Sequence, residues 1–278
     1  MDGNISFDGN SLQTFDKLTN TGIVTNAIDH SDIPDKNINL YELAGSDSSA
    51  ISSINYPSKN IRIAGVIAVG SDISSGSTRE EMLDELIDTF KGYFRGKNKN
   101  LDINYNGTTR RYKATANAVT INRTGTKTFA EFEVTFICVE PFGRDTTATT
   151  LIDDGTLGID GTSRTGSNYN DDVTFGGSAA VQCPVITITL NSVTDGDGSY
   201  IMVGNAATGQ QIIVQADWQD DDVLEIDTYN RTVKINGVEA SFTGAFPVFE
   251  PGDQVLTYAD SFTARDFDIG VDYYKLYL

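Results

Sequence analysis

Apolar and polar residues alternate with a period of two along much of this chain, the pattern of β-strands that bury one face. The clearest case is 129–140, where every second residue from Phe132 to Cys138 is apolar and the residues between them are Glu, Thr or Ile. Runs at 5–12, 61–69, 101–105 and 110–121 also have strand character. Asn106 and Gly107 separate the last two runs and predict a tight hairpin.

Residues 78–95 break this alternation and predict the one long helix. Thr78 and Glu81 have the spacing of a capping box, and Gly96 suits the position after a helix. Apolar residues recur at helical spacing on one stripe: Leu83, Leu86, Ile87, Phe90 and Phe94. For residues 1–144 we therefore expect a β-barrel or curled sheet packed on one helix.

Residues 145–177 differ in composition, because Gly, Thr, Asp, Ser and Asn make up 24 of the 33 positions. This predicts a linker or long loop with at most one edge strand. Short strand-like runs follow, with turns at Asn236–Gly237 and Pro251–Gly252. They are 184–190, 200–203, 211–215, 223–227, 232–235, 254–258 and 266–278. Such spacing is typical of a β-sandwich of the jelly-roll type, so we expect a mainly β protein with a second domain at 178–278.

The formal charge of −19 is unevenly distributed. Residues 1–144 hold 18 acidic and 15 basic side chains, whereas residues 145–278 hold 21 and 5. An acidic half repels phosphate, so we expect no nucleic-acid specificity. The bases concentrate at 91–127, which contains nine of them and one acid, Asp102. That region is either a solvated basic face or a contact with acidic partner surfaces.

No catalytic constellation is evident. The one histidine, His30, has only sequence neighbours as partners, and two cysteines 45 residues apart with no His pair do not make a zinc site. Cys138 and Cys183 are expected as free thiols in strands. The acidic loops 195–198 and 220–222 leave Ca²⁺ binding open, although neither matches an EF-hand. Trp218 beside them is either a sugar platform or a core or rim aromatic. We expect no cofactor.

Neither a secretory signal nor an apolar run of about 20 residues is visible, so we expect a protein assembled in a cytoplasm without membrane insertion.

Both halves resemble the distal tail proteins of phages with long flexible tails. In the first half the order of features carries the resemblance: a strand with Arg62 and Gly65, the helix, a hairpin with Arg111 and Tyr112, and a closing strand at 136–141. In the second half the features are Pro-x-Ile-x-Ile at 184–188, Leu-x-Ile-Asp at 224–227, the two turns, and a Tyr-rich end at 273–278.

The resemblance implies a structural protein of the virion tail tip, assembled in the host cytoplasm as a homohexameric ring. The ring would join the tail-tube protein to the tail-tip hub protein, with a galectin-like sandwich outside that could carry receptor-binding proteins. The ring interface is then expected near Lys91, Arg95, Lys97, Arg110, Arg111 and Lys113. A peripheral docking surface is expected at Asp195, Asp197, Trp218, Asp220, Asp221 and Asp222.

Two alternatives remain from the residues themselves. One is a carbohydrate-binding β-sandwich protein that holds sugar on its second domain. The other is a hydrolase that works with paired carboxylates, which 39 acidic residues make hard to assess by counting. A tail-tube subunit is a related structural alternative, but the acidic second half argues against a one-domain stacking protein.

Overall fold

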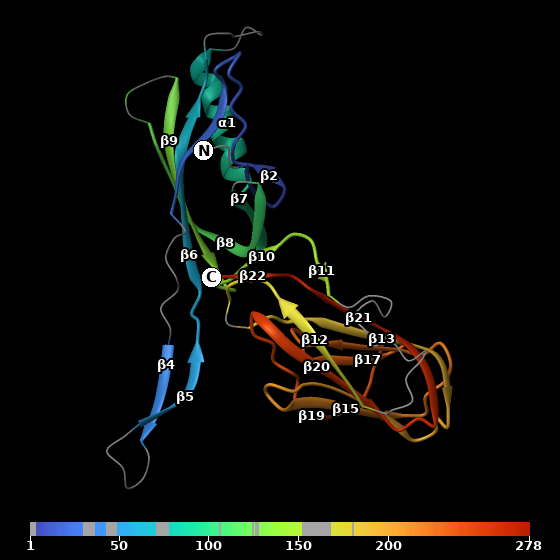
Figure 1. Cartoon of the computed structure of the whole chain (residues 1–278). Coiled ribbons are helices and arrows are strands. Elements are labelled where there is room, and N and C mark those ends of the chain that lie inside the picture. The colour runs from blue at the N-terminus through green and yellow to red at the C-terminus, as the bar shows by residue number, and fades with distance from the viewer. Residues whose placement is uncertain are drawn as a thin grey trace. The chain divides into compact units, whose positions relative to one another are not determined.

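The structure is a computed structural model of the chain that describes residues 4–29, 37–42, 49–70, 78–105, 107–123, 125, 128–151, 168–179 and 181–278. The chain divides into two compact units, Met1–Arg144 with Leu278, and Asp145–Tyr277. Both are built mainly of strands, and the described part of the chain holds one helix (Figure 1). The expected fold class, mainly β with one principal helix, is therefore confirmed.

The first unit is a curled antiparallel sheet with the strand order β2-β1-β7-β8-β9-β6-β3. β2 and β3 are the two ends of this order, and residues 12–14, which follow β2, hydrogen-bond to the first half of β3. Its strands are β1 (Ile5–Phe7), β2 (Asn10–Ser11), β3 (Gly22–Asp29), β6 (Lys59–Ala68), β7 (Lys99–Tyr105), β8 (Thr108–Asn122) and β9 (Phe129–Cys138), with β10 (Gly143–Asp145) beside β8. A separate pair is formed by β4 (Asn37–Glu42) and β5 (Ser49–Asn55).

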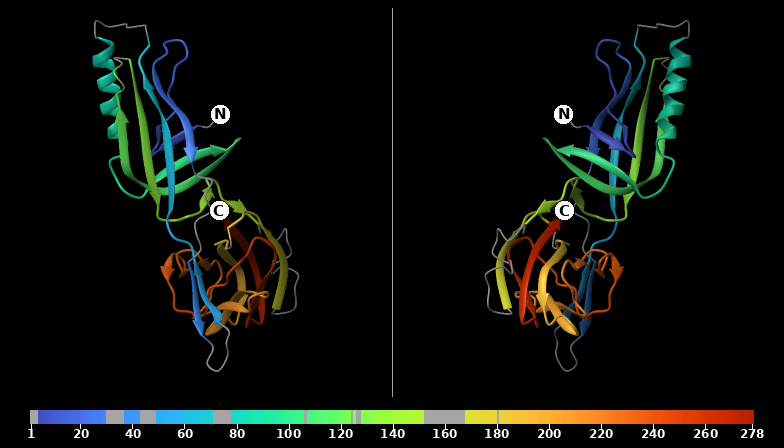
Figure 2. Two further views of the ribbon diagram at one scale, coloured as in Figure 1. Left: turned by 90° about the vertical axis from the view of Figure 1, so that its left-hand side faces the viewer. Right: turned by 90° about the vertical axis from the view of Figure 1, so that its right-hand side faces the viewer.

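The helix α1 (Arg79–Gly92) runs alongside this sheet (Figure 2). Its capping box is confirmed: Thr78 Oγ1 accepts from the Glu81 N–H, and the Glu81 carboxylate accepts from the Thr78 N–H. Leu83, Ile87 and Phe90 are buried, as the apolar stripe predicts. The helix ends earlier than expected, with Tyr93 as its C-cap, so Gly96 lies beyond the residue that follows the helix.

Aromatic rings join the helix to the sheet. The ring centres of Phe90 and Phe132 on β9 are 4.6 Å apart. The ring centre of Phe94 lies 6.0 Å from that of Phe136 on the same strand and 5.8 Å from that of Phe7 on β1. The alternation predicted for β9 is confirmed, since every second residue from Phe132 to Cys138 is buried. These contacts bury one face of the sheet and leave the opposite face without a helix.

The second unit is a β-sandwich of two antiparallel sheets, as predicted. The six-stranded sheet has the order β11-β21-β13-β16-β17-β18, and the five-stranded sheet has the order β12-β20-β14-β15-β19. The first consists of β11 (Thr149–Thr150), β13 (Val185–Thr194), β16 (Val223–Asp227), β17 (Thr232–Ile235), β18 (Val238–Glu239) and β21 (Ala264–Tyr273). The second consists of β12 (Asn168–Phe175), β14 (Ser199–Asn205), β15 (Gln210–Ala216), β19 (Thr243–Gly244) and β20 (Gly252–Asp260); β22 (Leu276–Tyr277) follows near the end of the chain.

The inward side chains of the two sheets form one apolar core that includes Ile188, Val203, Leu224, Tyr258 and Phe267. Asn236 and Gly237 both adopt positive φ, 52° and 77°, and connect β17 to β18 as the hairpin signal predicts.

Residues 145–177 are more than a linker where the structure describes them. β11 pairs with β21, and β12 pairs with β20 along its whole length, from Asn168↔Ala259 to Phe175↔Gly252. Tyr169, Val173 and Phe175 of β12 are buried in the sandwich core. The sandwich therefore begins before residue 178, because alternating apolar residues at the end of a polar segment complete the edge of its sheet.

Candidate interaction surfaces

The predicted basic region separates into residues with different surroundings. On the β7–β8 hairpin, Arg111 Nε and a terminal nitrogen donate to the two carboxylate oxygens of Asp102, at 2.7 and 2.8 Å. Lys113 Nζ donates to Asn100 Oδ1 at 2.7 Å on the same face. Arg110 belongs to the opposite face, where its guanidinium lies 4.9 Å from the ring centre of Tyr105. Neighbours in the sequence thus point to opposite sides of one strand.

The helix end presents the other predicted bases. Lys91 pairs with Asp88 at 3.1 Å. Arg95 and Lys97 are exposed, and within the described residues neither has a recorded ion pair or hydrogen bond. Of the six bases predicted for a ring interface, these two are the best placed to meet another molecule, because their charges are not engaged within the unit.

The β8 strand has an open edge that the sequence did not reveal. Its residues 108–114 pair with β7, and its residues 114–122 pair with β9 on the other side. Beyond Ala116, therefore, no described strand pairs with the side of β8 that faces away from β9. Ala118, Val119 and Thr120 are exposed there. Such an edge presents unpaired backbone N–H and C=O groups that can pair with another strand.

The opposite end of the same sheet is partly open. The first half of β3 is covered, because Ile23 O accepts from the Thr14 N–H at 3.0 Å and the Thr25 N–H donates to Gln13 Oε1 at 2.9 Å. From Asn26 to Asp29 no described strand pairs with the outer side of β3.

The registers place these two open edges at the same level of the sheet. Ala27 of β3 is opposite Ala64, which is opposite Glu133, which is opposite Thr120 of β8. In the same way, Asp29 shares a row with Ala118 through Arg62 and Thr135. Within the described part of the chain, a four-stranded section of the sheet therefore lacks a strand partner on both sides along the same stretch.

The face between these edges is hollowed by a cavity of about 400 Å³, lined by β3, β6, β8 and β9. Gly65 forms part of its lining, and an added Cβ there would lie 2.1 Å from Val24 O. Its acidic residues are Glu131 and Glu133, and Glu133 is paired with Arg62. The cavity thus has polar walls but no grouping of a nucleophile and a base.

In the second unit the predicted acidic residues gather in loops that cross between the two sheets. Residues 195–198 connect β13 to β14, and residues 217–222 connect β15 to β16. Residues 261–263 connect β20 to β21, and Thr263 Oγ1 donates to Asp195 Oδ2. These contacts bring the first and third loops together.

Most of these aspartates hold the loops in shape. Asp220 accepts from the Val193 N–H at 2.8 Å, and Asp222 accepts from the Gln219 N–H at 2.8 Å and from Asn236 Nδ2 at 2.7 Å. Asp197 and Asp221 are exposed, and among the described residues neither carboxylate has a hydrogen bond, although the Asp221 N–H donates to Leu190 O at 2.6 Å. Most carboxylates of these loops therefore accept hydrogen bonds that hold the loops in shape. The carboxylates of Asp197 and Asp221 remain accessible from outside.

Trp218 does not lie on the surface, which corrects its place in the predicted docking surface. It is 2% exposed, and its indole N–H donates to Ser199 O at 3.0 Å. The same loop folds the Trp218 backbone against Gly196, where an added Cβ would lie 2.0 Å from Trp218 O. Because its one polar group is satisfied, the ring joins the sandwich core and cannot serve as a sugar platform.

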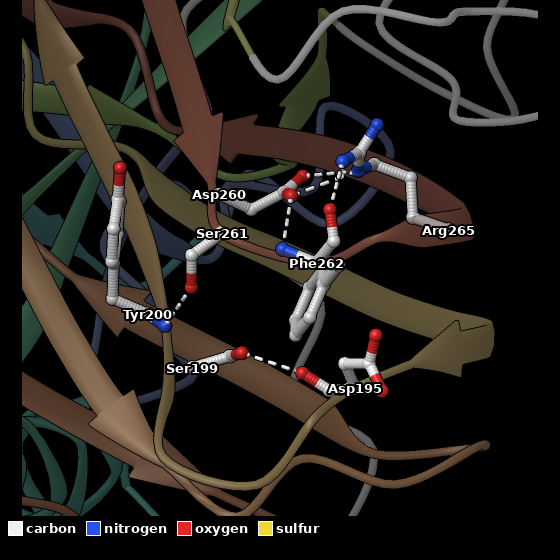
Figure 3. A network of polar contacts seen from close by, with 7 residues as sticks. All are labelled: Asp195, Ser199, Tyr200, Asp260, Ser261, Phe262 and Arg265. Carbon is white, nitrogen blue, oxygen red and sulfur yellow. Dashed lines mark hydrogen bonds and ion pairs between the residues drawn. The ribbon is translucent and has the colours of Figure 1, made fainter.

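A buried ion pair supports the third loop (Figure 3). Arg265 Nε lies 2.7 and 2.8 Å from the two carboxylate oxygens of Asp260, and their side chains are 5% and 0% exposed. Asp260 also accepts from the Phe262 N–H at 2.9 Å, and Arg265 donates to Phe262 O at 2.6 Å. Burial raises the pKa of Asp260, against the lowering effect of the Phe262 N–H and Arg265.

His30 lies outside the described residues. Cys138 is buried and Cys183 is half-buried; both are free thiols, and burial raises the pKa of Cys138 to about 12. Among the described residues, no three Asp, Glu, His or Cys side chains are grouped to hold a metal ion. No helix in that part of the chain has the length and hydropathy needed to cross a bilayer.

Comparison with known proteins finds similarity to phage tail components. Residues 177–274 match the family model of the siphovirus-type tail component, C-terminal domain. No curated protein gives a significant match. The SPP1 Dit (gp 19.1) protein, described as a paradigm of the hub adsorption apparatus in phages that infect Gram-positive bacteria, aligns with a TM-score of 0.62 at 12% identity, over 100% of both chains.

The phage P2 baseplate in its activated conformation with Ca aligns with a TM-score of 0.41 at 11% identity, over 99% of this chain and 98% of that chain. The resemblance to phage distal tail proteins is thus confirmed, by the family match at residues 177–274 and by a fold shared along the whole chain.

Proposed function

We propose that this chain is a ring adaptor of a siphovirus-type tail tip, a homohexamer that joins the tail-tube protein to the tail-tip hub protein and the host-recognition apparatus. The premise is the tail-component domain at residues 177–274 and the whole-chain fold shared with SPP1 Dit. The role is structural rather than enzymatic and needs no cofactor. The particle is assembled in the host cytoplasm.

The observation that carries the ring is the pair of open edges at one level of the first sheet. Rotation about a ring axis preserves the direction of strands that run along that axis. Because successive strands alternate in direction from β3 to β8, β8 of one copy would meet β3 of the next as an antiparallel neighbour. The contact uses two different surfaces, so it is heterologous and closes into a ring when the rotation per copy divides a full turn.

The second unit supports a docking role. Its loops, held by hydrogen bonds of Asp220 and Asp222, present Asp197 and Asp221 at exposed positions, where a partner with a basic surface would meet their carboxylates. Receptor-binding proteins of the tail tip are the partners that this role implies. The bases Arg95 and Lys97 of the first unit are the corresponding candidates for contact with acidic surfaces of neighbouring ring or tube proteins.

A cysteine ladder tests the ring edges. In a Cys183→Ser background we would introduce Ala27→Cys together with Thr120→Cys, two positions in one row of the sheet. Within one copy they are three strand spacings apart, roughly 14 Å, which is too far for a disulfide. Mild oxidation is expected to give covalent species that extend up to the hexamer. A second pair, Asp29→Cys with Ala118→Cys, samples the next row on this face.

The controls separate edge contact from chance collision. Either single variant can give dimers at most, because one cysteine per copy cannot form a chain. Ala207→Cys, on an exposed loop of the second unit, replaces the β8 position in a matched control and is expected to give no ladder. If both row pairs stay monomeric at concentrations where the protein itself is hexameric, the ring uses other surfaces.

The carbohydrate-binding alternative depended on Trp218 as an exposed sugar platform, and Trp218 is buried. A different surface of the same sandwich carries the appropriate chemistry.

A further inference from the structure

The two outer faces of the sandwich differ in charge. On the six-stranded sheet, outward positions carry six acids and one base: Glu225, Asp227, Glu239, Asp266, Asp268, Asp272 and Lys234. Within the five-stranded sheet the outward acids are Asp172 and Asp253, both towards one end, and no base lies among its outward residues. A unit with 21 acids and 5 bases therefore keeps most of one face uncharged.

Most of that face carries amides and hydroxyls in place of charges. Asn168 and Asn170 of β12, Thr257 of β20, and Gln211 and Gln215 of β15 alternate with the buried positions of their strands. No hydrogen bond is recorded for the side chains of Asn170, Thr257 or Gln211 among the described residues. Amide and hydroxyl groups both donate and accept, whereas carboxylates only accept.

The centre of the face brings these groups together. The registers place Asn170 beside Thr257, Thr257 beside Gly204, and Gly204 beside Gln211. At Gly204 an added Cβ would lie 2.9 Å from Gln211 Cβ and 3.0 Å from Thr257 Oγ1. Because Gly204 has no side chain, the Thr257 hydroxyl and the Gln211 side chain can lie next to it from the two neighbouring strands.

Apolar surface lies next to this polar row. Met202 and Ile213 are paired neighbours on the same face and are half-buried, and Tyr200 is 39% exposed on the next outward position of β14. Tyr200 and Gly204 are four residues apart, about 13 Å along a strand. The strip from Tyr200 to Gly204 is therefore longer than a single sugar ring.

We propose that the outer face of the five-stranded sheet binds an uncharged oligosaccharide. Sugar hydroxyls form hydrogen bonds with the side chains of Asn170, Thr257 and Gln211. The C–H faces of the sugar rings contact Tyr200, Met202 and Ile213. Sugars combine an apolar face with hydroxyls that donate and accept, and this strip offers both kinds of contact side by side. The site needs only this sheet, so it stands or falls independently of the ring.

The methionines give a direct test in the full chain. There are three of them, and the outward-facing Met202 lies in the proposed site, whereas Met82 lies on α1 of the first unit. With ¹³C-methyl methionine, titration with chitohexaose, maltohexaose or a galacto-oligosaccharide is expected to shift the Met202 signal for at least one probe and to leave Met82 unchanged. A Met202→Leu variant assigns the signal.

Variants then locate the contact. Asn170→Ala with Gln211→Ala removes two exposed amides and is expected to weaken binding roughly tenfold. The matched control, Thr187→Ala with Thr189→Ala on the opposite face, is expected to leave affinity unchanged. The proposal is overturned if Met202 does not shift with any probe up to about 10 mM, if Met82 shifts equally, or if the control pair weakens binding as much as the amide pair.

Discussion

Individual aspartates of the acidic second unit have different structural roles. Asp220 and Asp222 accept hydrogen bonds from backbone N–H groups and shape a loop, whereas Asp260 forms a buried ion pair with Arg265. A net charge of −19 therefore does not translate into one acidic binding surface. Where carboxylates fold loops, their removal should change stability before it changes binding.

We expect Asp260→Ala to lower the free energy of unfolding by about 3–5 kcal/mol, because it leaves the Arg265 guanidinium buried without its carboxylate. Urea unfolding measures this. Asp197→Ala, at an exposed position, should stay within about 0.5 kcal/mol of the parent protein. A loss below about 1 kcal/mol at Asp260 would show that the pair contributes little to the fold.

Trp218 makes the burial of the 217–222 loop measurable, because it is the one tryptophan of the chain. Since its ring is 2% exposed, its fluorescence should be emitted at short wavelength and be quenched poorly by acrylamide until the sandwich unfolds. Quenching as efficient as that of free tryptophan in the native protein would contradict the buried position and revive an exposed aromatic platform.

Among the elements, α1 owes its start to a local signal. Thr78→Ala should lower stability by about 1 kcal/mol, because the Glu81 N–H loses its acceptor. Thermal unfolding of the first unit measures this. Thr78→Ser keeps the hydroxyl and serves as the matched control, for which little change is expected. An equal loss in both variants would mean that packing of the threonine methyl group, and not capping, is responsible.

The same cap predicts a pH dependence. The hydrogen bond from the Thr78 N–H lowers the pKa of Glu81 below its ordinary value of 4.5, so the folded state favours the charged carboxylate. This contribution is present above the ordinary pKa and is lost as pH falls through the lowered one. The stability difference between the parent protein and Glu81→Ala should therefore shrink as pH falls below 4.5. A difference that stays constant down to about pH 3 would exclude the charged cap as its source.

At the scale of the whole molecule, self-assembly is the central prediction. Light scattering should give a mass of about 180 kDa, six times the 30.1 kDa of one chain. Negative-stain images of that peak should show six-fold rings with a central hole. A monodisperse monomer would leave the ring to be induced by a tube or hub partner, and mixing with that partner would then have to produce it.

The helix and most strands could be predicted because their signals are local, whereas β3, β4 and β5 were not among the predicted runs. The alternation at Phe132–Cys138, the capping box at Thr78 and the positive-φ turn at Asn236 each depend on a few adjacent residues, and each is found in the structure. The end of α1 was less predictable. Gly96 suited a C-terminal cap, but the chain leaves the helix at Tyr93 to enter β7.

The candidate site was only partly predictable, for reasons visible at two residues. Trp218 sits among aspartates in the sequence, but its loop turns the ring inward and satisfies its N–H at Ser199 O. Gly204 carries no motif, yet the register brings Thr257 and Gln211 together beside it from strands far apart in the chain.

The sequence by itself determined the helix, most of the strands, the acidic second half, the sandwich and the resemblance to tail proteins, because periodicity, turn residues and composition are properties of neighbouring positions. Tertiary structure alone decided which edges stay open, which aspartates accept hydrogen bonds within the loops and which face of the sandwich carries few charges. These depend on strand order and register, which pair residues such as Ala27 and Thr120 across intervening strands. A local pattern specifies that a strand exists but not its neighbours, so the surfaces available to a partner emerge only once the sheets are assembled.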